Sequence, residues 1–275
     1  MSWGLVLSGG AAYGLANAGV LEVLEEEHIK PDYIAGSSMG AIVASLCALG
    51  HSTAELRALT DDMKMNNVAK FSDKFFKEGL HGGFFRQRLE EHLYKIIGDA
   101  CIGDCKTPFV CVAGKIKQPI KWQRIIKEGF AKHVMESVEL HIFDDDTRII
   151  DALMASSAIP VVFSPHEIDG AQYVDLCHFG PIPARSLQNI HHPDCIVATD
   201  TNPTYDTLEK MMPPSWKEFL QAGSLEMEKS LAICDLVIKP KMPAPLYRFD
   251  KVEAFWKAGR IAAEENLEEL KVLLQ

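Results

Sequence analysis

The chain has 275 residues, of which 47% are hydrophobic and 24% charged, a composition that suits a globular enzyme with a large core. Its formal net charge of −10 argues against a nucleic-acid partner and against electrostatic docking to anionic membranes, because both need clustered Lys and Arg. The seven cysteines are odd in number and loosely spaced, so we expect reduced thiols and a cytoplasmic location. No basic residue precedes the first apolar run, which argues against a signal peptide.

The chain opens with two strand–turn–helix units. Residues 3–7 predict a buried strand, and residues 11–28 predict a helix whose glutamates between positions 22 and 27 form a solvated face. Residues 33–35 predict a second strand, and residues 41–49 a helix without charge that should be buried all round. The two uncharged stretches that contain these units are each about as long as a membrane span, ~20 residues. Glycine-rich turns interrupt both stretches, so we interpret them as buried soluble elements.

The later elements are less regular. Residues 55–93 are mostly helical with a glycine-rich break, residues 109–113 predict a strand, and residues 114–145 stay unassigned, with a hairpin as one interpretation. A helix is expected at 147–156, capped by one of the three aspartates at 144–146. A hairpin turn at Asp169-Gly170, strands at 195–199 and 236–239, and a closing helix at 252–274 complete the chain order. Strands and helices that alternate in this way predict an α/β sandwich with a mainly parallel sheet. No linker or repeat divides the chain, so we expect residues 1–275 to form a single domain.

The sequence Gly-Ser-Ser-Met-Gly at residues 36–40 has the Gly-x-Ser-x-Gly pattern of a nucleophile elbow. The pattern lies between a short strand and an uncharged helix, which is the context that the elbow requires. A sharp strand-to-helix turn presents the central hydroxyl at a helix N-terminus, where the partial positive charge favours an anionic intermediate. We therefore predict that Ser38 is a nucleophile; the alternative is a purely structural turn.

A second glycine-rich loop, Ser-Gly-Gly-Ala-Ala-Tyr-Gly, occupies residues 8–14 between the first strand and the first helix. Small residues at such a place leave convergent backbone N–H groups bare, which favours an anion. A nucleotide phosphate loop is one interpretation, but the three-glycine spacing fails at Ala11 and a Walker lysine is missing. An oxyanion hole that serves Ser38 fits better. The elbow follows only the second strand, which argues against the ordinary α/β-hydrolase order.

These motifs together resemble the patatin-like phospholipases. The matching segments cover nearly the whole chain and are residues 5–14, the glycine-rich loop; 36–41, the elbow; 155–160 and 163–165, a helix-to-strand block; 173–175, the aspartate motif; and 232–240 with 249–259, a C-terminal strand and helix. The resemblance implies a three-layer α/β/α sandwich with a mainly parallel central sheet. It also implies a serine hydrolase that acts on lipid acyl esters, of phospholipase A or lysophospholipase type.

By the same resemblance, Ser38 attacks the acyl carbonyl and Asp175 serves as its base in a Ser–Asp dyad. Backbone N–H groups of Gly9, Gly10 and Ala11 form the oxyanion hole. The family implies neither a metal nor a cofactor. The expected partners are a lipid substrate and, transiently, the surface of a membrane or micelle.

The chain departs from the family at two places. Ala11 replaces a third glycine and Tyr13 an arginine in the loop, and Leu176-Cys177 replaces the Gly-Gly that follows the aspartate. An intact Ser38 and Asp175 favour an active enzyme, but the departures leave open a weak or inactive relative that binds lipid or a partner.

Other side chains offer further alternatives. A Ser-His-Asp acyl hydrolase or acyltransferase would need a histidine such as His178. Cys101, Cys105 and Cys111, or His191 and His192 with Cys195, lack ordinary zinc spacing, so we interpret the cysteines as structural thiols. A calcium site at the three aspartates is a further alternative to their role as a cap. The phenylalanine pairs at residues 75–76 and 84–85 suit either an acyl channel or the core.

Overall fold

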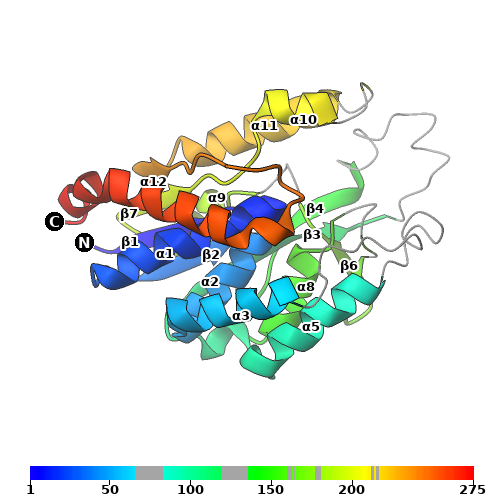
Figure 1. The fold of residues 1–275 in the computed structure, drawn as a ribbon. Coiled ribbons are helices and arrows are strands. Elements are labelled where there is room, and N and C mark those ends of the chain that lie inside the picture. The colour runs from blue at the N-terminus through cyan, green and yellow to red at the C-terminus, as the bar shows by residue number, and fades with distance from the viewer. Residues whose placement is uncertain are drawn as a thin grey trace.

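The computed structural model describes residues 1–65, 83–118, 136–159, 163, 165–176, 181–211, 214 and 217–275. Its centre is a sheet that helices cover on both faces (Figure 1). The phenylalanines at 75–76 and Cys177 with His178 lie outside the described residues, as do the side chains of Phe84 and Phe85. Within the described part of the chain, no helix combines the length and the apolar character that crossing a bilayer needs.

Eight strands form the described sheet. They are β1 (Trp3–Leu7), β2 (Tyr33–Gly36), β3 (Phe109–Ile116), β4 (Val138–Ile142), β5 (His166–Ile168), β6 (Ala171–Val174), β7 (Cys195–Thr199) and β8 (Leu236–Ile238). Their order is β5-β6-β3-β2-β1-β7-β8, with β4 also paired to β3. The five neighbouring strands β3, β2, β1, β7 and β8 are parallel to one another. β4, β5 and β6 add antiparallel pairs at the β3 side of the sheet.

The helices lie between these strands in the chain. The α-helices are α1 (Ala16–Glu26), α2 (Met39–Leu49), α3 (Thr53–Met65), α5 (Gly83–Ile97), α8 (Ile149–Ser156), α9 (Ala184–His191), α10 (Tyr205–Met211), α11 (Lys217–Leu231) and α12 (Val252–Leu273). Short 3-10 helices are η1 (Ala11–Leu15), η3 (Ile102–Asp104) and η6 (Phe249–Lys251).

The alternation of side chains along β1 separates two apolar layers. Leu5 and Leu7 pack into a large core with side chains of α1, α2, α8 and α12. Val6 points to the other face and packs into a smaller core with Leu187 of α9, against which α11 also packs. The predicted three-layer sandwich with a mainly parallel sheet is therefore confirmed.

One predicted detail of the helices is wrong, and a second holds only in part. None of the three aspartates caps α8, because Arg148 occupies the N-cap position without a side-chain bond. Asp144 instead accepts a hydrogen bond from the Thr147 hydroxyl at 2.7 Å in the preceding turn. Glu25, Glu26 and Glu27 are exposed as predicted, whereas Glu22 is half-buried and accepts hydrogen bonds from Trp256 and Arg260 of α12.

Helices α1 and α12 lie side by side, and glycines allow their close approach (Figure 1). A Cβ atom added to Gly19 would lie 1.9 Å from the carbonyl oxygen of Trp256. One added to Gly259 would lie 1.9 Å from the carbonyl oxygen of Ala16. The backbones of the two helices therefore meet directly at these two positions.

Candidate active site

The turn between β2 and α2 holds Ser38 in a strained conformation. Its backbone φ is 51° and its ψ is −128°, a combination that residues other than glycine rarely adopt. A Cβ atom on Gly40 would lie 2.3 Å from the carbonyl oxygens of Leu7 and Ser8, so the last position of the pattern has room only for glycine. The predicted strand–turn–helix context of the Gly-x-Ser-x-Gly pattern is thus present.

Ser38 and Asp175 meet across a long distance in the sequence. The Ser38 hydroxyl donates a hydrogen bond of 2.6 Å to Oδ2 of Asp175, which directly follows β6. Both residues are buried, with exposed fractions of 7% and 5%. A short bond to a buried carboxylate polarises the hydroxyl, which is the arrangement that a nucleophile and its base require.

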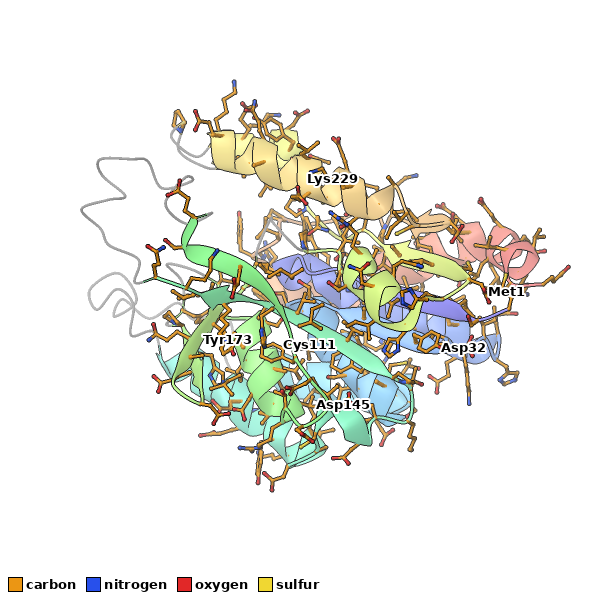
Figure 2. The ribbon with its side chains drawn as sticks, turned by 180° about the vertical axis from the view of Figure 1, so that it is seen from behind. Met1, Asp32, Cys111, Asp145, Tyr173 and Lys229 are labelled. Atoms are coloured by element: carbon orange, nitrogen blue, oxygen red, sulfur yellow. The ribbon has the colours of Figure 1, made fainter. Side chains whose placement is uncertain are left out.

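The C-terminal end of α8 contacts both members of this pair. Ser156 accepts a hydrogen bond from the Ser38 backbone N–H at 2.8 Å and donates one to the carbonyl oxygen of Val112 on β3 at 2.7 Å. Ala158, two residues further on, accepts the backbone N–H of Asp175 at 2.9 Å. Tyr173 of β6 and Cys111 of β3, labelled in Figure 2, lie on the paired strands beside this region.

The glycine-rich loop lies against the nucleophile. A Cβ atom on Gly9 would lie 3.1 Å from the Cβ atom of Ser38. The N–H of Gly9 is already bonded to the carbonyl oxygen of Pro181 at 2.9 Å, whereas the N–H groups of Gly10 and Ala11 have no acceptor among the described residues. Gly10 and Ala11 both have positive φ angles, 139° and 51°, so the loop is sharply turned here.

A buried polar cluster supports the loop, and only a faint signal of it is present in the sequence. The hydroxyls of Ser8 and Thr201 lie 2.8 Å apart, and Thr201 donates to the carbonyl oxygen of Gly9 at 2.7 Å. Asn17 donates to the carbonyl oxygen of Ser8 at 2.9 Å and accepts from the Thr199 hydroxyl. An asparagine within an otherwise apolar helix start was the one available hint, because buried polar groups need partners.

Two of the histidines considered as bases, His166 and His191, contact side chains other than Ser38. His166 pairs with Asp151 of α8 at 3.2 Å. His191 stacks on Tyr33 with ring centroids 4.7 Å apart. Tyr33 is the first residue of β2, so His191 lies at the opposite end of this strand from Ser38, which follows its last residue. Among the described residues, Asp175 is the side chain to which the Ser38 hydroxyl is bonded.

Two side chains at the departures from the family pattern, Tyr13 and Leu176, pack against neighbouring elements. Tyr13 is buried beside Phe255 of α12, with ring centroids 5.5 Å apart, and burial raises the pKa of its phenol. Leu176 packs beside Gly114 of β3, where its Cδ2 atom would lie 3.3 Å from an added Cβ atom. Tyr13 therefore belongs to an apolar cluster rather than to a charged brace of the loop.

Four of the described cysteines have thiols that are unsuited to reaction. Burial raises the pKa of Cys47 to about 11 and the pKa values of Cys105, Cys111 and Cys234 to about 12, so these thiols stay protonated near neutral pH. Over the described ranges, no group of three or more His, Cys, Asp or Glu side chains is arranged to hold a metal ion.

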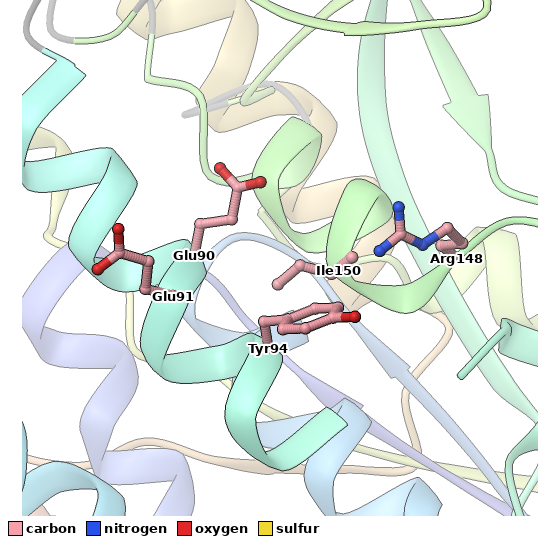
Figure 3. A pocket seen from close by; sticks show the side chains of 5 residues that line it. All are labelled: Glu90, Glu91, Tyr94, Arg148 and Ile150. Carbon is pink, nitrogen blue, oxygen red and sulfur yellow. The ribbon is translucent and has the colours of Figure 1, made fainter. Parts of the chain in front are cut away.

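A surface pocket of about 340 Å³ lies between α5 and α8 (Figure 3). Its lining residues are Glu90, Glu91, Tyr94, Arg148 and Ile150. Arg148 and Ile150 belong to the start of α8, whereas Ser156 ends that helix. Neither Ser38 nor Asp175 lines this pocket, so it is separate from the serine–aspartate pair.

The fold and this pair define an α/β protein in which a serine on a sharp strand-to-helix turn faces a buried aspartate. The sequence model of the family described as patatin-like phospholipase matches residues 5–175, which is more than half of the chain. The chain belongs to this family, and both Ser38 and Asp175 lie within the match.

Several known proteins are similar to this chain. An uncharacterized NTE family protein of Mycobacterium tuberculosis is 25% identical over 201 residues, covering 72% of this chain and 48% of that protein. Triacylglycerol lipase 5 of Saccharomyces cerevisiae is 44% identical over 69 residues, covering 25% of this chain and 9% of the lipase. The crystal structure of VipD from Legionella pneumophila aligns with a TM-score of 0.49 and 16% identity, covering 96% of this chain and 67% of VipD. The match thus spans about half the length of the mycobacterial relative.

Proposed function

We propose that this chain is a serine acyl-ester hydrolase that acts on lipids, with Ser38 as nucleophile and Asp175 as base. The observation that carries the proposal is the buried hydrogen bond of 2.6 Å from the Ser38 hydroxyl to the Asp175 carboxylate. Membership of the patatin-like phospholipase family and the similarity to a protein named triacylglycerol lipase support a lipid acyl ester as substrate. We assign the chain to the carboxylic ester hydrolases, of phospholipase A or lysophospholipase type.

In the proposed reaction, Asp175 takes the proton of Ser38 as its Oγ attacks the acyl carbonyl carbon. The tetrahedral intermediate collapses when the alcohol leaves with the proton from Asp175, and an acyl ester of Ser38 remains. Water then attacks this ester and gives a proton to Asp175, and the fatty acid leaves as Ser38 regains its proton. The route divides one difficult displacement into two easier steps.

The negative charge of each intermediate needs donors, and we assign the N–H groups of Gly10 and Ala11 to this role. Both groups are without an acceptor in the described structure, whereas the N–H of Gly9 is bonded to Pro181. Gly9 then serves the oxyanion hole by its close approach to Ser38, or donates after releasing Pro181. The N-terminus of α2, which begins at Met39, adds a favourable partial charge.

We also propose the extent of the domain, the cellular location of the enzyme and its contact with lipid surfaces. A sheet that joins β1 near the start of the chain to β8 near its end supports one patatin-like domain over residues 1–275. The described cysteines are all free, which suits the reducing cytoplasm. Contact with a membrane or micelle is then a transient event during lipid capture.

Ser38→Ala tests the proposal. Wild-type protein should hydrolyse a short-chain p-nitrophenyl ester and a lysophospholipid and react with a fluorophosphonate probe, and Ser38→Ala should lose all three reactions. Ser45→Ala is the matched control, because Ser45 is a buried serine of α2 whose hydroxyl, among the described residues, bonds to the nearby carbonyl oxygen of Ile42. It should keep activity within about 3-fold, as expected of a site with a purely local role. Wild-type turnover in Ser38→Ala would overturn the assignment.

The departures at Tyr13 and Leu176 favour one second candidate, a patatin-like protein that binds lipid or a partner without turnover. In that case the wild-type protein would bind phospholipid vesicles but neither hydrolyse an ester nor react with the fluorophosphonate. The same assay therefore separates the two candidates.

A further inference from the structure

The hydrogen bonds of Ser156 are not required by its own helix. Its side chain is 1% exposed, and its hydroxyl joins the Ser38 N–H, 118 residues away, to the carbonyl oxygen of Val112, 44 residues away. A hydroxyl has one proton, and the proton of Ser156 goes to Val112. Its oxygen is therefore the acceptor for Ser38, and the direction of both bonds is fixed.

The neighbouring serines behave differently. The hydroxyl of Ser157 bonds to the carbonyl oxygen of Leu153, one turn earlier in α8, and Ser45 makes the same kind of local bond within α2. Helical serines commonly bond in this local way. Ser156 instead reaches the peptide of a residue whose φ of 51° needs outside support.

We propose that Ser156 is a positioning residue, which holds the Ser38 peptide so that the side-chain oxygen faces Asp175. The proposal rests on the proposed function of Ser38. Because Ala158 also holds the N–H of Asp175, the end of α8 fixes both members of the pair from one short segment. The Ser156 hydroxyl and the Ala158 carbonyl thus set the 2.6 Å separation of the Ser38 hydroxyl and the Asp175 carboxylate.

Removal of the Ser156 hydroxyl leaves two buried groups, the Ser38 N–H and the Val112 carbonyl, without their partner. The Ser38 peptide then rotates to find another acceptor, and the side-chain oxygen moves away from Asp175. A displacement of ~1 Å at a reacting atom lowers the rate by ~10²-fold. The proposed role of Ser156 is to orient the nucleophile rather than to bind the acyl chain, so KM should change little.

The experiment compares the wild type with Ser156→Ala, Ser156→Thr and Ser157→Ala. With a short-chain ester, Ser156→Ala should lower kcat by ~10²-fold with KM within about 2-fold, and slow fluorophosphonate labelling in parallel. Ser156→Thr keeps the hydroxyl and should restore kcat to within about 5-fold of the wild type. Ser157→Ala should stay within about 3-fold, because its bond is local.

Amide hydrogen exchange at Ser38 gives a readout that does not depend on catalysis. Exchange should accelerate in Ser156→Ala, while the amides of β1 stay protected as in the wild type. If Ser156→Ala does not fold, Ser156→Cys replaces it, since a thiol is a weak acceptor, and the same kinetic and exchange changes are expected.

Two outcomes overturn the inference. One is a folded Ser156→Ala with wild-type kcat and an unchanged Ser38 exchange rate. The other is an equal loss of kcat in Ser156→Ala and Ser157→Ala. If the wild type lacks esterase activity and probe labelling, the proposed function fails, whereas the exchange measurement still decides whether Ser156 holds the Ser38 peptide.

Discussion

At the scale of single residues, the proposed chemistry depends on a carboxylate in the place where many serine hydrolases have an imidazole. An ordinary aspartate, with a pKa near ~3.9, is a weak base for a hydroxyl. The short bond between Ser38 and Asp175 offsets this weakness by holding the proton on the line of transfer. Donors at the oxyanion and the N-terminus of α2 stabilise the charge that develops on the substrate.

Asp175→Asn keeps the size of the side chain but removes the base. We expect kcat for ester hydrolysis to fall by at least ~10²-fold, on the scale of general-base catalysis, while the melting temperature stays close to that of the wild type. His166→Ala and His191→Ala should each lower kcat by less than ~10-fold, because these side chains contact Asp151 and Tyr33 rather than Ser38.

His178→Ala belongs in the same series as the test of a catalytic triad. A loss as complete as that of Ser38→Ala, together with an active Asp175→Asn, would show a histidine base. The proposed dyad would then be wrong, although membership of the family would stand.

The sequence identified the members of the candidate site better than it identified their supports. Ser38 and Asp175 stand in separate motifs, and the structure brings their side chains into contact. The pattern of residues 155–160 contains two serines, and nothing in it tells which one faces the elbow. Thr199 and Thr201 were equally hard to assign. Their roles depend on hydrogen bonds to Ser8, which follows the neighbouring strand β1 and begins the glycine-rich loop.

At the scale of helices and strands, the contact between α1 and α12 depends on two glycines. Alanine has a higher helix propensity than glycine by ~1 kcal/mol, so Gly259→Ala would stabilise an exposed helix. Here the added Cβ atom meets the carbonyl oxygen of Ala16 at 1.9 Å. We expect the free energy of unfolding to fall by ~1–3 kcal/mol, the usual range for overpacking.

Urea unfolding of Gly259→Ala measures this change, and its sign alone decides the question. Lys257→Ala is the control, because Lys257 is exposed on the same helix and its replacement should change stability by less than ~0.5 kcal/mol. A Gly259→Ala protein more stable than the wild type would mean that the two helices do not meet as closely as described.

The same scale shows which elements the sequence predicts well. β1 and β7 are continuous apolar runs, and the Asp169-Gly170 pair turns between β5 and β6 with positive φ at both residues, so these predictions are confirmed. Helices α9, α10 and α11 were not predicted. α9 has only eight residues with few apolar side chains, and its position becomes clear only when Leu187 packs on the sheet. Helices α9 and α10, with eight and seven residues, are shorter than the window of about 11–18 residues over which helical periodicity is judged.

At the scale of the whole molecule, acidic side chains join segments far apart in the chain. Glu22 of α1 accepts hydrogen bonds from Trp256 and Arg260 of α12 and from Arg57 of α3. Arg57 also lies over the Trp256 ring, 4.2 Å from its centroid. Burial raises the pKa of Glu22, but the bonds from Trp256 and the two arginines outweigh it, so the pKa lies below its ordinary value of 4.5.

This network predicts a loss of stability in acid. A carboxyl whose pKa is lowered by folding contributes its full stabilisation above pH ~4.5 and loses it as the pH falls through the lower folded value. Urea unfolding between pH 7 and pH 3 should therefore show a decline that begins near pH 5. Glu22→Gln should be less stable at pH 7 and should decline less steeply in acid.

Glu167→Gln is the control for that series, since Glu167 is an exposed residue of β5 without a described ion pair. An acid decline of the same steepness in Glu22→Gln and in the wild type would show that other groups govern the effect.

The place of β1 in the sheet also has a consequence for the order in which the protein is made. β1 pairs with β2, which follows soon in the chain, and with β7, in which Cys195 is the partner of Trp3. The loop after β1 is held by Pro181, Thr201 and Leu246, all of which leave the ribosome much later. The pairing of β1 with β7 can therefore form only after the chain has been synthesised through Thr199, and pairings between such distant segments fold slowly. Ser38 therefore precedes in synthesis the residues that hold the adjacent loop, so we expect the proposed ester hydrolysis only after residues up to Leu246 have folded around it.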